Sequence, residues 1–219
     1  MKKFFELNHT LSDGMAAYPG MPSPSIGAFL NHSQSRSHYE NKAEFYIGKF
    51  DIVCTVGTYL DSPFHRYPGG DDLSQIPLEK IAGLPGIVFE GIMSKDRSIT
   101  IDCIKEDLRG RAVLIKTGWD DRWGLDKYWE QGPFLSQELV ELLIRAEAAL
   151  VGVDFWNIDN TQDPIRPAHT QLLASNILVV EHLCNLRDLP RDGFKFYAIP
   201  LRIEKGASFP VRAFAEIDA

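Results

Sequence analysis

The sequence of 219 residues predicts one α/β domain. Short apolar runs suited to buried strands alternate along the chain with segments whose apolar residues repeat at helical spacing. The runs at 112–117 (AVLIKT) and 177–181 (ILVVE) are largely apolar, as strands covered on both faces are. No linker, change of composition, internal repeat or low-complexity tract divides the chain. We therefore expect a single domain over residues 1–219.

The charge and composition narrow the class of function. A formal net charge of −7 argues against nucleic acid and against an anionic membrane surface as partners, because both require a basic patch. No apolar run reaches the roughly 18 residues of a membrane span, and the start of the chain lacks the pattern of a signal peptide. Cys54, Cys103 and Cys184 lie too far apart for a CxxC metal site. We expect a cytoplasmic protein that acts on a small molecule.

The elements follow from local patterns. Apolar or alternating runs bounded by turn residues predict strands over 4–7, 45–54, 86–91, 112–117, 150–155, 177–181, 194–203 and 210–215. The clearest helix covers 136–149, because Ser136 is a good N-cap and leucines follow at helical spacing. We also expect a helix over 169–175, a short helix from about Pro77, and a helical or turn segment over 104–108. The polar stretch 26–38 predicts an exposed connection or strand pair in which His32 and His38 are solvated.

The segment Thr55–Gly70 (TVGTYLDSPFHRYPGG) combines an acid and a histidine four residues apart. Pro63 and the Gly69–Gly70 pair disfavour a helix here, so Asp61 and His65 are expected on an extended segment that leaves a sheet. A rigid scaffold can direct such side chains at a ligand. The alternative is structural, because an aspartate before Ser-Pro commonly forms a turn.

Glu181 closes an apolar strand, and His169 begins the helix before it. A carboxylate at such a position must be paired, bound to a metal or solvated at the rim of the sheet. With a histidine nearby, it suits a Zn, Mn or Mg site. The alternative is that Glu181 caps the strand and pairs with Arg187 or Arg202.

Two further features suit a ligand site. Tyr18, in a Tyr-Pro-Gly turn, either pins its loop or stacks on a planar substrate. The loop 118–124 follows a predicted strand and carries two tryptophans, at a position where open α/β folds usually bind ligands. The sequence contains no GxSxG, P-loop, GxGxxG or HExxH motif, so the chemistries that those motifs serve are not indicated.

These residues carry a resemblance to a known family. The stretch TVGTYLDSPFH at 55–65 resembles the motif HxGTHxDxPxH of the cyclase family of metal-dependent hydrolases, which includes bacterial kynurenine formamidases and isatin hydrolases. The resemblance continues through IPLEKI, VLIKTGWDDRWG, LVGVDFWNID, the unit from His169 to Glu181, and AIPLRI. It covers nearly the whole chain. It implies a swivelling β/β/α fold with a central mixed sheet or barrel, assembled as a homodimer or homotetramer.

The resemblance also implies roles for single residues. It makes Asp61, His169 and Glu181 metal ligands, His65 the general acid/base, and Tyr18 a contact of the substrate. The chain departs from the motif at its first two histidines, which are metal ligands in the family. They are Thr55 and Tyr59 here, so we expect at most one divalent metal ion, Zn or Mn, on the remaining three ligands.

Two hypotheses follow. In the first, the protein hydrolyses a linear or cyclic amide, a formamide or a lactone with a metal-bound water, while His65 transfers the proton. Tyr59 then donates a hydrogen bond to the oxyanion in place of a lost metal. In the second, the protein is a metal-free relative that binds a small planar ligand, or that uses Asp61, Tyr59 and His65 for acid/base chemistry. The replacement of both histidines motivates the second hypothesis.

Overall fold

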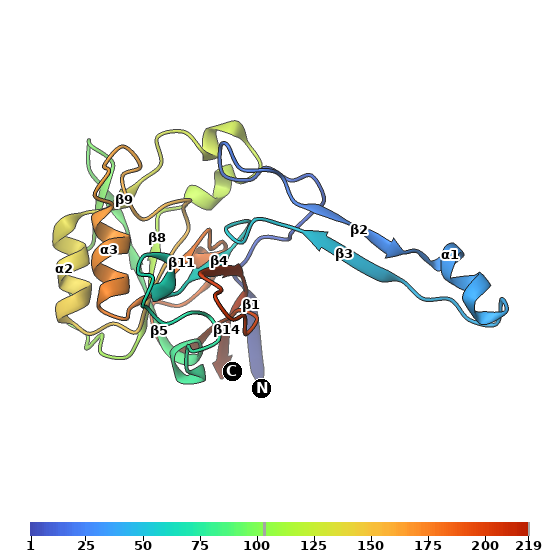
Figure 1. Cartoon of the computed structure of the whole chain (residues 1–219). Coiled ribbons are helices and arrows are strands. Elements are labelled where there is room, and N and C mark those ends of the chain that lie inside the picture. Colours follow the sequence, from blue (N-terminus) through green and yellow to red (C-terminus); the bar gives the residue numbers. More distant parts are fainter. Residues whose placement is uncertain (103, 219) are drawn as a thin grey trace.

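The computed structural model describes residues 1–102 and 104–218, and its centre is a mixed sheet of nine strands (Figure 1). In spatial order the strands are β1 (Lys2–Glu6), β14 (Arg212–Asp218), β12 (Phe194–Ile199), β5 (Ala82–Glu90), β8 (Ala112–Lys116), β10 (Leu150–Val153), β11 (Leu178–Glu181), β4 (Tyr59–Asp61) and β13 (Ser208–Pro210). The run β5, β8, β10 and β11 is parallel, and the strands on both sides of it pair antiparallel.

Both faces of the central strands are buried, which explains their apolar sequences. Val113, Ile115 and Val151 point to a core that is shared with the helices, whereas Leu114 and Leu150 point to a second core on the other face. The helices α2 (Gln137–Arg145) and α3 (Pro167–Ala174) lie together against the first face (Figure 1). The second core joins side chains from both ends of the sheet, so the sheet curls around it.

The smaller elements lie outside this sheet. A hairpin of β2 (Ser25–Leu30) and β3 (Ile47–Asp51) projects far from the body and carries α1 (His32–Arg36) at its end (Figure 1). The strands β6 (Ile92–Met93), β7 (Ser98–Thr100) and β9 (Phe134–Leu135) form a small sheet. Single 3-10 turns are η1 (Ser37–Tyr39), η2 (Pro63–His65), η3 (Leu78–Lys80), η4 (Trp119–Arg122), η5 (Asp126–Tyr128) and η6 (Leu186–Asp188).

The predicted mixed α/β fold is confirmed, and most element boundaries move by a few residues. α2 ends at Arg145 rather than at 149, because Ala146 is the C-cap and Glu147 adopts the left-handed conformation, with φ of 53°. The predicted short segment at 104–108 is not helical. The segment from Pro77 forms the single turn η3, and His32 and His38 are exposed.

Two further findings concern the described residues. Cys54 and Cys184 are free thiols, and Cys103 lies outside the described residues. Within residues 1–102 and 104–218, none of the helices has both the length and the apolar character that crossing a membrane requires.

Candidate metal centre

The pairing of β4 brings the candidate residues together. In the antiparallel pairing with β11, Tyr59 lies opposite Glu181 and Asp61 opposite Val179, and in the pairing with β13, Asp61 lies opposite Ser208. Since side chains alternate along a strand, Tyr59 and Asp61 share one face, while Leu60 between them fills the core on the other face. Three adjacent strands thus present polar side chains to one buried point.

The turn into β4 depends on a glycine of the motif. Gly57 has φ of 66°, and a Cβ at this position would lie 2.5 Å from the Leu11 side chain. The contact is with a terminal methyl group, which can move, so the positive φ is what favours glycine at this position. Thr55 lies in the same turn and is half-buried.

His65 does not lie on an extended segment, which corrects the prediction. The chain turns directly after β4 into η2, where Pro63 occupies the first turn and the His65 N–H donates to the Ser62 carbonyl at 2.9 Å. A proline is readily accepted at the start of such a turn, because its missing N–H has no partner there. The turn brings the His65 ring back towards Asp61, with Nδ1 3.6 Å from Asp61 Oδ1, and leaves 36% of its side-chain surface exposed.

His169 is fixed by an aspartate that the sequence analysis missed. Asp159 accepts hydrogen bonds from the Ala168 and His169 N–H groups at 2.6 and 3.3 Å, and so caps the start of α3. Its Oδ2 also lies 2.6 Å from His169 Nδ1. This contact occupies Nδ1 and directs Nε2 at the cluster, where it lies 3.5 Å from Asp61 Oδ2 and 3.5 Å from Glu181 Oε1.

Glu181 does not pair with either of the two arginines that the alternative hypothesis named. Arg187 binds Asp120 and Asp121, and Arg202 donates to the Ser74 carbonyl. Glu181 is fully buried and instead accepts the Tyr59 hydroxyl on Oε2 and the Ile158 N–H, at 2.7 Å, on Oε1. The Tyr59 hydroxyl is therefore committed to Glu181 and does not point into open space.

The cluster combines three buried carboxylates with a buried imidazole. Asp61, Asp159 and Glu181 lie around His169, and Arg166 adds a further positive charge, with its Nε 3.5 Å from Asp159 Oδ2. Burial lowers the pKa of His169, but Glu181, Asp159 and Asp61 outweigh burial and raise the pKa to about 10. Burial raises the pKa of Glu181 to about 7, and burial together with Glu181 raises the pKa of Tyr59 well above 10. Bound protons thus offset the negative charge of the carboxylates, and a metal cation would offset the same charge.

The donor atoms fit one metal ion. Asp61, His65 and His169 each place a ligand atom within 4.8 Å of the others. Asp61 Oδ2 is buried and has no hydrogen-bond partner in the structure, since the His169 contact at 3.5 Å is only an ion-pair approach. An unpaired carboxylate oxygen in such a place is costly unless a ligand completes it. Glu181 contacts His169 in the same cluster. Two sets of three ligands are therefore available, Asp61 and His169 together with either His65 or Glu181.

Ser208 is a second residue that sequence reasoning missed. Its hydroxyl donates to Asp61 Oδ1 and lies 3.1 Å from His65 Nδ1, so it joins the two motif residues. No sequence pattern marks it, because only the pairing of β13 with β4 brings it to the motif from 147 residues away. Asp159 carries no such signal either, because the N-cap position of α3 is Arg166, and Asp159 reaches the start of the helix from the preceding loop.

Tyr18 does not touch the cluster but belongs to an aromatic group beside it. Its ring centroid lies 6.2 Å from that of Trp129 and 5.5 Å from that of Trp156. The group connects to the cluster through His182, whose ring lies 5.7 Å from Trp129 and 5.4 Å from Tyr59. Burial lowers the pKa of His182 to about 3, so this ring stays neutral, and its Nδ1 lies 2.8 Å from the Tyr128 hydroxyl.

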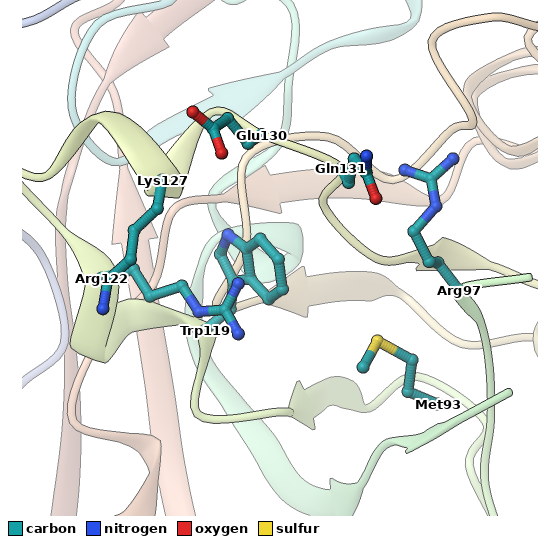
Figure 2. Close-up of a pocket in the computed structure, with 7 residues that line it drawn as sticks. All are labelled: Met93, Arg97, Trp119, Arg122, Lys127, Glu130 and Gln131. Atoms are coloured by element: carbon teal, nitrogen blue, oxygen red, sulfur yellow. The ribbon is translucent and has the colours of Figure 1, made fainter. Parts of the chain in front are cut away.

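The loop that follows β8 lines a separate hollow. Figure 2 shows the Arg122 guanidinium beside Trp119, with Lys127 and Arg97 around the same space of about 400 Å³. The Arg122 guanidinium lies 3.7 Å from the centre of the Trp119 ring. The prediction of a ligand site at this loop therefore leads to a separate hollow, which is not lined by Tyr59, Asp61, His65, His169 or Glu181.

The curled sheet thus carries a buried cluster of carboxylates and imidazole in which Asp61, His65 and His169 place their ligand atoms close together. The model of the family described as "Putative cyclase" matches residues 5–160, and the chain belongs to this cyclase family. It is 25% identical to a kynurenine formamidase of Bacillus cytotoxicus over 213 residues, with 96% of each chain covered.

Two further comparisons agree. The chain is 25% identical to an isatin hydrolase of Roseibium aggregatum, over 82% of this chain and 78% of that one. Its fold is similar to the crystal structure of an isatin hydrolase bound to the product analogue thioisatinate, with a TM-score of 0.81 at 22% identity over 100% of this chain and 93% of that one. The predicted family and fold are thereby confirmed.

Proposed function

We propose that the protein is a metal-dependent hydrolase. It cleaves the C–N bond of a non-peptide amide, either a formamide or a cyclic amide, or the acyl C–O bond of a lactone. The observation that carries this proposal is the orphaned Asp61 Oδ2, buried 3.5 Å from an imidazole whose other nitrogen is occupied. Membership of the cyclase family, whose named relatives include formamidases and isatin hydrolases, supports the reaction class.

Asp61, His169 and Glu181 are the proposed ligands of one Zn²⁺ or Mn²⁺ ion. Two carboxylates and one neutral imidazole suit either metal and leave positions open for water and substrate. A divalent cation bound there polarises a carbonyl oxygen and lowers the pKa of water. Asp159 holds His169 in the tautomer that presents Nε2, and Tyr59 keeps Glu181 in place through its hydroxyl.

His65 is the proposed general acid/base. Its ring is exposed, so the substrate can reach it, while Ser208 fixes Nδ1. The free Nε2 can then take a proton from the attacking water and deliver it to the leaving nitrogen or oxygen. The half-buried Tyr18, with Trp129 and Trp156, offers aromatic faces and edges to a planar substrate.

The test compares the parent protein with His65→Ala on a panel of aryl formamides, isatin-type cyclic amides and aryl lactones. We expect the parent to hydrolyse at least one class, and His65→Ala to lose about 10²- to 10⁴-fold in kcat, the usual contribution of a positioned acid/base. Elemental analysis of both proteins should show the same metal content.

The matched control is His38→Ala, which removes an exposed histidine on the projecting hairpin and should retain full activity. Unchanged hydrolysis in His65→Ala would contradict the acid/base role. Loss of the metal from His65→Ala would instead make His65 a ligand, in the set with Asp61 and His169.

Asp159→Asn should weaken metal binding while the fold persists. The amide can still accept from the backbone at the start of α3, but it cannot balance a charged or metal-bound His169 as a carboxylate does. We expect the affinity for Zn²⁺ to fall by about 10- to 100-fold, as for other partners of metal-ligating histidines. Competition with a chromogenic chelator measures this change, and Asp163→Asn, in the same loop, is the control. Equal affinities in Asp159→Asn and the parent would show that Asp159 only caps the helix.

A further inference from the structure

The hollow drawn in Figure 2 gathers positive charge away from the candidate metal centre. It lies between the β6–β7 hairpin, which contributes Met93 and Arg97, and the loop that joins β8 to β9, which contributes the other lining residues. Three bases and one acid line it, namely Arg97, Arg122, Lys127 and Glu130. The lining therefore carries a net charge of +2 in a chain whose net charge is −7. We call this space the arginine hollow.

Two arginines of the hollow lack an acidic partner. In the described ranges 1–102 and 104–218, four arginines are half-buried, and two of them, Arg111 and Arg166, each pair with an aspartate. The other two are Arg97 and Arg122, and none of the ion pairs among the described residues includes either of them. Arg97 donates one hydrogen bond, to the Gly132 carbonyl at 3.2 Å, and Arg122 makes a ring contact. A guanidinium has five N–H donors, and its strongest hydrogen bonds are to anions, so both side chains suit an anionic ligand.

The Trp119 side chain fixes the position of one of these charges. Its indole N–H donates to the Tyr128 carbonyl at 2.9 Å, and the ring is buried. The Arg122 guanidinium lies 3.7 Å from the centre of this ring, which is a cation–π contact. Such stacking covers a face of the guanidinium and leaves the N–H groups at its edge for an acceptor. The acceptor site is therefore formed before a ligand arrives, which lowers the cost of binding.

The arrangement of the two arginines indicates what the hollow can hold. In Figure 2, the Arg97 and Arg122 guanidinium groups lie on opposite sides of the space, so a ligand that meets both carries an acceptor group at each end. The fork of a guanidinium matches a carboxylate bidentately. Met93 and Trp119 add apolar surface for the part of the ligand that joins these groups. The volume of about 400 Å³ is that of a small-molecule site. A metal cation is not suited, because the hollow offers one carboxylate against three positive charges.

We propose that the arginine hollow binds a small dicarboxylate, with one carboxylate on Arg97 and the other on Arg122. The two negative charges of such a ligand match the net charge of the lining. Lys127 is exposed and adds to the attraction, whereas Glu130 opposes it. Binding here does not depend on the proposed hydrolase activity, because none of the proposed metal ligands lines the hollow.

Isothermal titration calorimetry with terephthalate and adipate tests the proposal. The matched monoanions are 4-acetylbenzoate and hexanoate, which keep the size of the ligand and replace one carboxylate by a neutral group. We expect at least one dicarboxylate to bind with a Kd of about 1 mM or tighter, and its monoanion to bind at least about 10-fold more weakly, because one charged contact is lost. A dicarboxylate that binds no tighter than its monoanion, or no binding of either dicarboxylate at about 20 mM, overturns the proposal.

Substitutions in the hollow locate the binding. We expect Arg97→Gln and Arg122→Gln each to weaken dicarboxylate binding at least about 10-fold, since each removes one charge-assisted contact. Both variants should keep the circular dichroism spectrum of the parent, because neither side chain belongs to a buried ion pair. The matched control Arg109→Gln changes an exposed arginine that pairs with Glu147, and it should keep the affinity of the parent. Glu130→Gln should bind at least as tightly as the parent, because it removes the acid of the hollow. Weaker binding by Glu130→Gln would overturn the assignment to the arginines.

Asp61→Asn separates the hollow from the candidate metal centre, where a carboxylate can also bind a metal ion. We expect this variant to bind the dicarboxylate with the affinity of the parent. Binding that is lost in Asp61→Asn but kept in Arg97→Gln and Arg122→Gln would place the ligand at the metal centre and overturn the proposal. A protein that is inactive on every hydrolase substrate is expected to give the same titrations, so the two proposals fail separately.

Discussion

An Asp61→Asn protein is expected to lose its metal ion and almost all of its hydrolase activity. Asp61 supplies the buried oxygen of the cluster that has no hydrogen bond, Oδ2, and contacts both His169 and Ser208. The amide keeps the size of the carboxylate but carries no charge and places an N–H₂ group where a cation would bind. A bound cation contributes several kcal/mol of transition-state stabilisation, so we expect kcat/KM to fall by about 10³-fold or more.

The measurement is metal content per chain, alongside hydrolysis of the best substrate from the panel. Asp72→Asn is a matched control, because Asp72 is also buried but binds Ser74 and the Lys205 N–H instead of the cluster. If the parent takes up no Zn²⁺ or Mn²⁺ even from an excess, the metal-free hypothesis replaces the proposed function. If Asp61→Asn keeps the metal, the ligand set proposed here is wrong.

The double substitution Thr55→His/Tyr59→His is expected to raise the metal content from one ion per chain to two. It restores the family motif in a stretch that otherwise matches it. In the structure, the Tyr59 hydroxyl occupies Glu181 Oε2, and Thr55 lies in the turn just before β4. Removing the phenol frees a carboxylate oxygen, and two neutral imidazoles then supply the nitrogen ligands that Zn²⁺ favours.

Isothermal titration of the metal-free proteins with Zn²⁺ gives the number of sites. Tyr59→Phe is the matched control, because it removes the phenol without adding a ligand, and it should bind one ion. A double variant that still binds a single ion, at the parent's affinity, would show that the backbone around Thr55 no longer permits a second site. Two ions on Tyr59→Phe would show that the phenol alone excludes the second ion.

Much of this fold can be predicted from the sequence, because each central strand has a recognisable local pattern of apolar residues. Runs such as 112–117 and 177–181 are apolar enough to require burial on both faces, and Ser136 marks where α2 begins. The short strands are different. β13 has three residues and β9 has two, so their sequences carry too little pattern to be recognised, and pairing with a neighbour is what makes them strands.

The residue types of the candidate site were determined by the sequence alone: an aspartate and a histidine flanking Pro63, a glutamate closing an apolar strand, and the loss of two motif histidines. Only the tertiary structure decided their partners. The antiparallel register of β4 set Tyr59 on Glu181 rather than leaving that carboxylate for an arginine, and it brought Ser208 to Asp61. These contacts join residues more than 120 positions apart, and such pairings depend on how strands align in space, which local sequence does not encode.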